Sequence, residues 1–153
     1  MNPRIGLALL RIGMGLYFIS QAGGKTPSFL LSGANLGQQL QRGLGNMPPF
    51  YQEFVRGVVL PHVDLFARLV FFGEWLTGLC LVLGLLTPLA AIVGIWLNSN
   101  YMLMKGLGSA AGGVDRLFVL ADVVFIAAGA GLVLGLDALL LRRVRAARKR
   151  PRA

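Results

Sequence analysis

The chain has one cysteine and one histidine among its 153 residues. A single cysteine, Cys80, excludes a disulfide within the chain and any C-x-x-C dithiol chemistry. A single histidine, His62, cannot supply the paired axial ligands of a haem, nor a three-ligand zinc site by itself. We therefore expect no metal or haem site. Any redox chemistry must use electrons carried by a bound molecule or by another protein.

Charged residues are also scarce, at 14%, whereas 56% of the residues are hydrophobic and the mean hydropathy is +0.69. These values exceed those of typical soluble domains. Apolar runs at about 5–22, 63–85, 88–105 and 116–140 each come near the ~20 residues that cross ~30 Å of hydrocarbon. The sequence therefore predicts an all-α fold, a four-helix transmembrane bundle that forms one domain over 1–141. We interpret 5–22 as a retained helix because no A-x-A-like cleavage site follows it.

The net charge of +9 arises mainly from a basic tail at residues 142–153, which holds seven of the 15 basic residues. Outside this tail, 8 basic residues face 6 acidic ones. A polybasic segment directly after a membrane span is typical of a cytoplasmic tail that contacts anionic lipid. We therefore expect a multi-pass protein of the plasma membrane with both termini in the cytoplasm, and no nucleic-acid partner.

An outer loop of residues 25–61 separates the first two predicted spans. Leu36, Leu40 and Leu44 recur at i, i+4 and i+8, which predicts a short amphipathic helix. Aromatic residues follow Pro48 and Pro49 in MPPFYQEF, as is typical of segments at a membrane interface. We expect the loop to form a short amphipathic helical cap over the outer face of the bundle.

Two opposite charges interrupt the apolar runs. Glu74 lies near the middle of 63–85, and Arg11 lies near the middle of 5–22. Because an isolated charge in the bilayer centre costs at least about 2.5–3.5 kcal/mol, we expect Arg11 and Glu74 to form an ion pair. The sequence leaves two roles open for this pair, a purely structural salt bridge or the floor of a ligand or proton site.

Further polar residues lie toward the outer ends of the predicted helices, where helical spacing can place them on one shared face. The sequence therefore predicts an outward-facing polar cavity that is closed below by Arg11 and Glu74, with no comparable polar set in the cytoplasmic half. The candidate catalytic residues are Glu74, Arg11 and Asp122. The candidate ligand-binding residues are Lys25, Asn98, Asn100, Tyr101 and Trp75.

Three stretches carry a resemblance to a known family: LLRIGMGLYFISQAGGK, LVFFGEWLTGLCLVLGLLTPLAA and NSNYMLMKG. Through them the chain resembles the DoxX/DoxD membrane proteins, which include the small membrane subunit of thiosulfate:quinone oxidoreductase. The stretch PPFYQEFVRGVVLPH resembles the DoxD branch. The resemblance implies a four-helix membrane bundle with a role in respiratory-type redox chemistry, and it places Arg11, Lys25 and Glu74 at family positions. Pro88 departs from the family, since a basic residue is common there.

The favoured function is an integral membrane subunit of a quinone-linked oxidoreductase system that binds a quinone, or a small anionic sulfur compound, in the outward cavity. Lys25 and Arg11 would attract the ligand, and Glu74 or Asp122 would take up a proton. The expected partners are the lipid bilayer, a second redox subunit or soluble oxidoreductase, and further copies of the chain as a homo-oligomer. The alternatives are a non-catalytic scaffold for a redox enzyme and a small solute transporter, so catalysis by the chain itself stays open.

Overall fold

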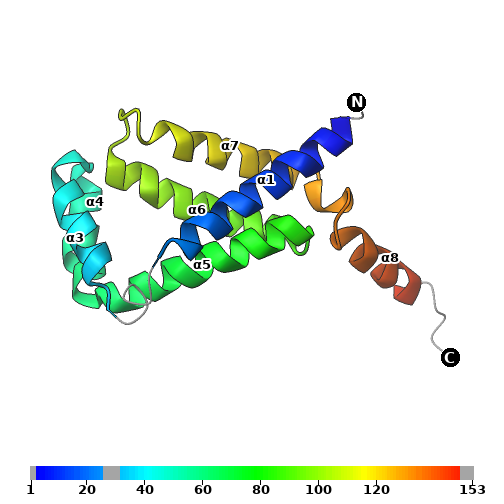
Figure 1. The fold of residues 1–153 in the computed structure, drawn as a ribbon, viewed down its shortest axis with the longest axis horizontal. Helices are drawn as coiled ribbons and strands as arrows, with labels where there is room; N and C mark the ends of the chain where they lie inside the picture. The colour runs from blue at the N-terminus through cyan, green and yellow to red at the C-terminus, as the bar shows by residue number, and fades with distance from the viewer. Residues whose placement is uncertain (1–2, 26–31, 149–153) are drawn as a thin grey trace.

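The computed structural model describes residues 3–25 and 32–148, and over these ranges the chain forms helices and connecting turns with no strand (Figure 1). The all-α prediction is therefore confirmed for this part of the chain. Loop residues 26–31 and the end of the predicted tail, 149–153, lie outside the described residues. Four long helices run lengthwise beside one another: α1 (Pro3–Gly23), α5 (Val63–Leu83), α6 (Thr87–Lys105) and α7 (Gly113–Ala127).

The packing of these helices combines an apolar exterior with several polar groups inside. α1 packs on α5, α5 on α6, and α6 on α7. The buried polar side chains are Arg11, Glu74, Thr77, Thr87, Asn98, Asp115 and Asp122. Leu69, Phe72 and Leu76 of α5 are instead at least half exposed. An apolar exterior around internal polar groups is the arrangement that a lipid solvent favours.

Two helical segments are long and apolar enough to cross a membrane by length and composition. They are Pro3–Gly23 and the run Pro49–Leu83, with mean hydropathies of 1.4 and 1.6 over their best windows. In the second segment the N-terminal part consists of several short helical turns before α5 begins. α5 itself supplies the apolar length that matches one crossing.

The α1–α5 contact depends on glycines that let the two backbones approach closely. A Cβ atom added at Gly15 would lie 2.8 Å from the carbonyl oxygen of Gly78 and 2.8 Å from the backbone nitrogen of Val82. A Cβ atom at Gly78 would lie 2.9 Å from the carbonyl oxygen of Gly15. Because backbone atoms cannot move aside cheaply, the contact requires glycine on both helices.

We expect Gly15→Ala to lower the free energy of unfolding by about 2 kcal/mol, because the added methyl group forces α1 away from α5. Gly13 is the matched control, since a Cβ atom there meets nothing within 4 Å. Gly13→Ala should be neutral or slightly stabilising because alanine favours the helix. Thermal unfolding in detergent measures both changes, and equal melting temperatures for the two variants would contradict the close contact.

A helical segment between α1 and α5 lies across one end of the long helices (Figure 1). It consists of α3 (Ala34–Gly43), η1 (Leu44–Asn46), α4 (Pro49–Phe54), the π-helical turn η2 (Val55–Val59) and η3 (Leu60–His62). Its own apolar cluster comprises Leu36, Leu40, Met47, Tyr51, Val55, Val59 and, from α5, Ala67. Tyr51 Oη donates a hydrogen bond of 2.9 Å to Asn100 Oδ1, so the segment is tied to α6.

The predicted fourth span, 116–140, is not one continuous helix. α7 ends at Ala127, η4 (Ala130–Leu132) follows, and a separate helix α8 (Asp137–Arg148) begins within the predicted span. Gly129 and Leu134 adopt left-handed backbone angles, with φ of +60° and +48°. The amide of Asp137 donates to the carbonyl oxygen of Gly84 at 2.8 Å, which ties the interruption to the end of α5. Non-helical backbone inside a membrane protein is tolerated only where such partners satisfy it.

Asp137 also stabilises the start of α6. Its carboxylate accepts hydrogen bonds from the backbone amides of Leu86, at 2.6 Å, and Thr87, at 2.9 Å. Leu86 has a φ of +48°, which a β-carbon disfavours. The carboxylate thus offsets a strained turn and satisfies amides that a helix N-terminus leaves without intrahelical partners.

Candidate functional site

A cavity of about 350 Å³ lies between the long helices at the end that carries α3 and α4. This volume falls in the range of small-molecule sites. The side chains that line it come from α1, α3, α5, α6 and α7, so the folded arrangement of all these helices is needed to form it. The lining residues are Tyr17, Phe18, Gln21, Gly24, Lys25, Gln39, Glu74, Asn98, Tyr101, Met104, Lys105 and Asp115.

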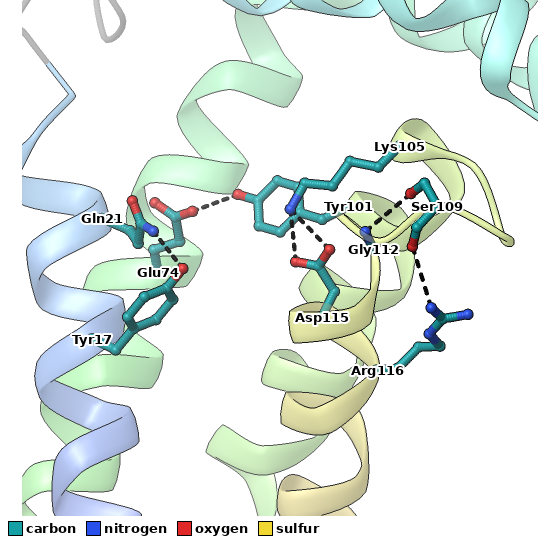
Figure 2. A network of polar contacts seen from close by, with 9 residues as sticks. All are labelled: Tyr17, Gln21, Glu74, Tyr101, Lys105, Ser109, Gly112, Asp115 and Arg116. Carbon is teal, nitrogen blue, oxygen red and sulfur yellow. Dashed lines mark hydrogen bonds and ion pairs between the residues drawn. The ribbon is translucent and has the colours of Figure 1, made fainter.

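Glu74 is the central polar group of this cavity. Its side chain is only 2% exposed, and it forms an ion pair with Lys25 Nζ and accepts a hydrogen bond from Tyr101 Oη. Side chains on a helix lean toward its N-terminus. Glu74 therefore leans toward the N-terminal end of α5, which is the end with α3 and α4. Tyr101 lies near the C-terminal end of α6 and leans back along α6 toward Glu74. Figure 2 shows the phenol and the carboxylate meeting in this way.

A second ion pair closes the rim of the cavity. Lys105 Nζ lies 2.8 Å from Asp115 Oδ2, and the same ammonium group lies 5.8 Å from the centre of the Tyr101 ring (Figure 2). On the α1 side, Gln21 Nε2 donates a 2.6 Å hydrogen bond to Tyr17 Oη. Tyr101 is thus held at its hydroxyl by Glu74 and at its ring face by Lys105.

The prediction of an ion pair between Arg11 and Glu74 is wrong. Arg11 instead donates hydrogen bonds to the carbonyl oxygens of Ala130, at 3.0 Å, and Leu134, at 3.2 Å. These carbonyl groups belong to the interruption after α7. Arg11 also contacts Gly84, which lies ten residues after Glu74, or about 15 Å further along the axis of α5.

The prediction that the second half of the bundle has no comparable polar set is also wrong. Arg11, Thr87 and Asp137 gather where α1, the start of α6 and the interruption meet. The backbone there is close-packed, since a Cβ atom at Gly131 would clash with Asp137 Oδ2 and Thr87 Oγ1. This cluster organises helix ends and lies away from the cavity.

The structure brings together four of the predicted site residues, Lys25, Glu74, Asn98 and Tyr101. Of the described residues, the cavity lining leaves out Arg11, Trp75, Asn100 and Asp122. Asn100 bonds with Tyr51 outside the cavity, and the Trp75 ring lies 6.5 Å from that of Phe71.

Asp122 is fully buried between α6 and α7, close against Gly94. Within the described parts of the chain, neither carboxylate oxygen has a hydrogen-bond partner. Its position below Asp115 on the same helix places it deeper than the cavity rim. It is therefore a separate polar group from the cavity site.

Tyr17, Gln21 and Gln39 line the cavity but were not predicted from the sequence. Tyr17 and Gln21 precede Lys25 at intervals of four, so helical spacing could have placed them on the same face as this lysine. Gln39 comes from α3 and could not be placed without knowing how that segment lies. Among the described residues, no group of three or more histidine, cysteine, aspartate or glutamate side chains is arranged to hold a metal ion.

Comparison with known protein families gives a match over nearly the whole chain. The sequence profile of the DoxD family, described as TQO small subunit DoxD, matches residues 6–151, nearly the whole chain. No curated protein and no solved structure matches the chain. Together with the two apolar helices and the apolar exterior, the family match identifies a membrane protein. The chain belongs to the DoxD family.

Proposed function

We propose that the chain is a membrane subunit of a quinone-linked oxidoreductase and that it binds the quinone ring in the cavity around Glu74. The observation that carries this proposal is a buried carboxylate, held by Lys25 and Tyr101, in the wall of a cavity of about 350 Å³. The description of the family as the small subunit of TQO supports it. In this proposal α1, α5, α6 and α7 form a four-helix bundle across the plasma membrane. α3 and α4 cap its outer face, and both termini are cytoplasmic.

The lining of the cavity suits a quinone ring. Lys25 has three N–H donors, so it can donate to a quinone oxygen while it stays paired with Glu74, and the rings of Tyr17 and Phe18 offer apolar surface to the quinone face. Each quinone oxygen gains a proton on reduction, and in this proposal Glu74 takes up a proton from the cavity and passes it to the nearer oxygen. The electrons come from a partner subunit or soluble oxidoreductase, because the chain has no evident electron carrier of its own.

The charges of the cavity favour a neutral quinone over a sulfur oxyanion. Lys25 and Lys105 are the lining cations, and each pairs with a lining carboxylate, Glu74 or Asp115. These four formal charges sum to zero. A dianion would therefore meet two carboxylates as well as two ammonium groups, and its desolvation would be poorly offset.

Asp122 remains our candidate for a proton acceptor below the cavity. It lies seven residues after Asp115 on α7, which is about 10 Å deeper along the helix. A buried carboxylate without a partner is costly when ionised, which is why such groups in membranes often serve proton transfer. Asp122→Asn should then slow quinone-linked turnover of the membrane complex without weakening quinone binding, and equal turnover would remove this role.

We expect Glu74→Gln to weaken the binding of a quinone by about tenfold, because a neutral amide no longer holds Lys25 and Tyr101 as the carboxylate does. Titration calorimetry of the purified chain in mild detergent measures this change. Glu53→Gln is the matched control, since Glu53 is exposed on α4 and lies outside the cavity lining. It should leave the affinity within about twofold of the original chain.

The outcomes of this titration separate the candidate functions. If the Glu74→Gln and Glu53→Gln chains bind the quinone with equal affinity, Glu74 does not contribute to the binding site. Tighter binding of thiosulfate than of the quinone would replace the proposed ligand with an anion. A chain that binds neither but co-purifies with a soluble oxidoreductase would support the scaffold function instead.

A further inference from the structure

The Tyr101 side chain separates the polar cavity from a second pocket that is almost entirely apolar. This pocket has a volume of about 50 Å³ and lies beneath α3 and α4, against α5 and α6. Tyr101 and Met104 line both spaces. Among the other side chains that line the apolar pocket are Leu40, Phe54, Phe66, Val70 and Trp96.

The edge of this apolar pocket is formed by side chains at the exterior of the helices. Trp96 is 47% exposed and Phe54 is 38% exposed. The amide of Asn100 also reaches the pocket, but its oxygen accepts the Tyr51 hydroxyl and its nitrogen donates to the carbonyl oxygen of Trp96 at 2.7 Å. The pocket therefore offers apolar walls to an occupant that approaches from the lipid side.

We propose that this pocket holds the start of the isoprenoid chain of the quinone whose ring occupies the polar cavity. The inference rests on the function proposed above and names the route of the ligand. A quinone dissolved in the bilayer is an amphiphile, so its ring requires polar partners while its chain requires apolar walls. The two spaces supply these surfaces on opposite sides of Tyr101.

The dimensions limit what the pocket can hold. One water occupies about 10–15 Å³ of such volume, so about 50 Å³ accepts only a few heavy atoms, near the size of one isoprene unit. The rest of the chain would lie in lipid beyond Trp96 and Phe54. Met104, with its flexible thioether side chain, is the part of the shared wall that yields most easily.

The test compares two probes, a benzoquinone with methyl substituents only and the same ring with a ten-carbon chain. Val70→Phe fills the pocket from α5, so it should weaken binding of the chain-bearing probe by about tenfold and that of the ring-only probe by less than about twofold. Leu69→Phe is the matched control, because Leu69 is the preceding residue and is 50% exposed on the outside of α5. It should change neither affinity.

Because the chain-bearing probe also enters detergent micelles, the decisive quantity is the ratio of the two affinities in each variant. Phe54→Trp provides a second variant that narrows the edge of the pocket at a partly exposed side chain, and the thermal unfolding of each variant checks its folding. If both variants weaken the binding of the two probes equally, or change neither affinity, the apolar pocket does not hold the isoprenoid chain. The proposed ring site would be unaffected by that result. If neither probe binds the original chain, the proposed function itself fails.

Discussion

Replacing Arg11 by alanine should destabilise the protein by about 3 kcal/mol or more, because it removes two hydrogen bonds from a charged donor and leaves a cavity where the guanidinium group was buried. Both carbonyl groups, of Ala130 and Leu134, lie in the interruption between α7 and α8, which Arg11 ties to α1. The guanidinium group is fully buried, so no water replaces it readily. Arg11→Lys should recover only part of the lost stability, because one ammonium group cannot donate to both carbonyl oxygens in the planar geometry of the guanidinium group.

Thermal or chemical unfolding in detergent measures this effect. Arg42→Ala, at an exposed arginine of α3, is the control and should change the stability by less than about 0.5 kcal/mol. A stronger test adds Glu74→Gln to Arg11→Ala. Since the two side chains belong to separate clusters, their effects should add within about 0.5 kcal/mol. A large coupling energy would mean that Arg11 and Glu74 interact directly, which contradicts the observed partners of both side chains.

The error about Arg11 has a simple physical origin. Counting residues from the helix ends places Arg11 and Glu74 at the same depth, but the observed register of α1 against α5 does not. Gly15 packs against Gly78 and Val82, so Arg11, about one turn earlier on α1, lies beside Gly84 and about 15 Å from Glu74. Side chains lean toward the N-terminus of their helix. Because α1 and α5 are antiparallel, Arg11 leans away from the end with α3 and α4, whereas Glu74 leans toward it. The lean of the two side chains thus adds to a separation that the register of the helices already sets.

The interruption after α7 could not be predicted from hydropathy, because AAGAGLVLGLD is apolar throughout until its aspartate. Only the glycines at 129, 131 and 135 hint at a break, and glycine is common in membrane helices for packing reasons. What fixes the break is tertiary: the amide of Asp137 reaches Gly84 and the guanidinium of Arg11 reaches Ala130. Such partners are far apart in the sequence, so a search for local signals does not find them.

The parts of the site that could be predicted are those with strong local reasons. Glu74 stands out because a carboxylate in an apolar run requires a partner. Lys25, at the end of the first helix, was identified on its own but was not matched to Glu74. The match needed the lean of both side chains and the close α1–α5 contact at Gly15 and Gly78. Sequence therefore identified the members of the cavity better than their pairing.

Replacing Lys25 by alanine should destabilise the protein by about 2 kcal/mol, since it leaves Glu74 buried as an uncompensated charge. The loss is below that for a fully buried pair because the Lys25 side chain is 20% exposed and partly solvated. The second lysine pair provides the comparison. Lys105 is 35% exposed beside Asp115, so Lys105→Ala should cost about 1 kcal/mol or less.

Coupling between Lys25 and Glu74 is the sharper measurement. Glu74→Gln removes the buried charge, so the double variant Lys25→Ala with Glu74→Gln should be within about 1 kcal/mol of the original chain. The loss from Lys25→Ala alone should therefore be largely recovered, in contrast to the additive behaviour expected for Arg11 with Glu74. Unfolding of the four chains in one detergent gives both coupling energies. If Glu74 coupled strongly to Arg11 and not to Lys25, its carboxylate would lie near Arg11 at the opposite end of the bundle. The cavity would then lack its central carboxylate.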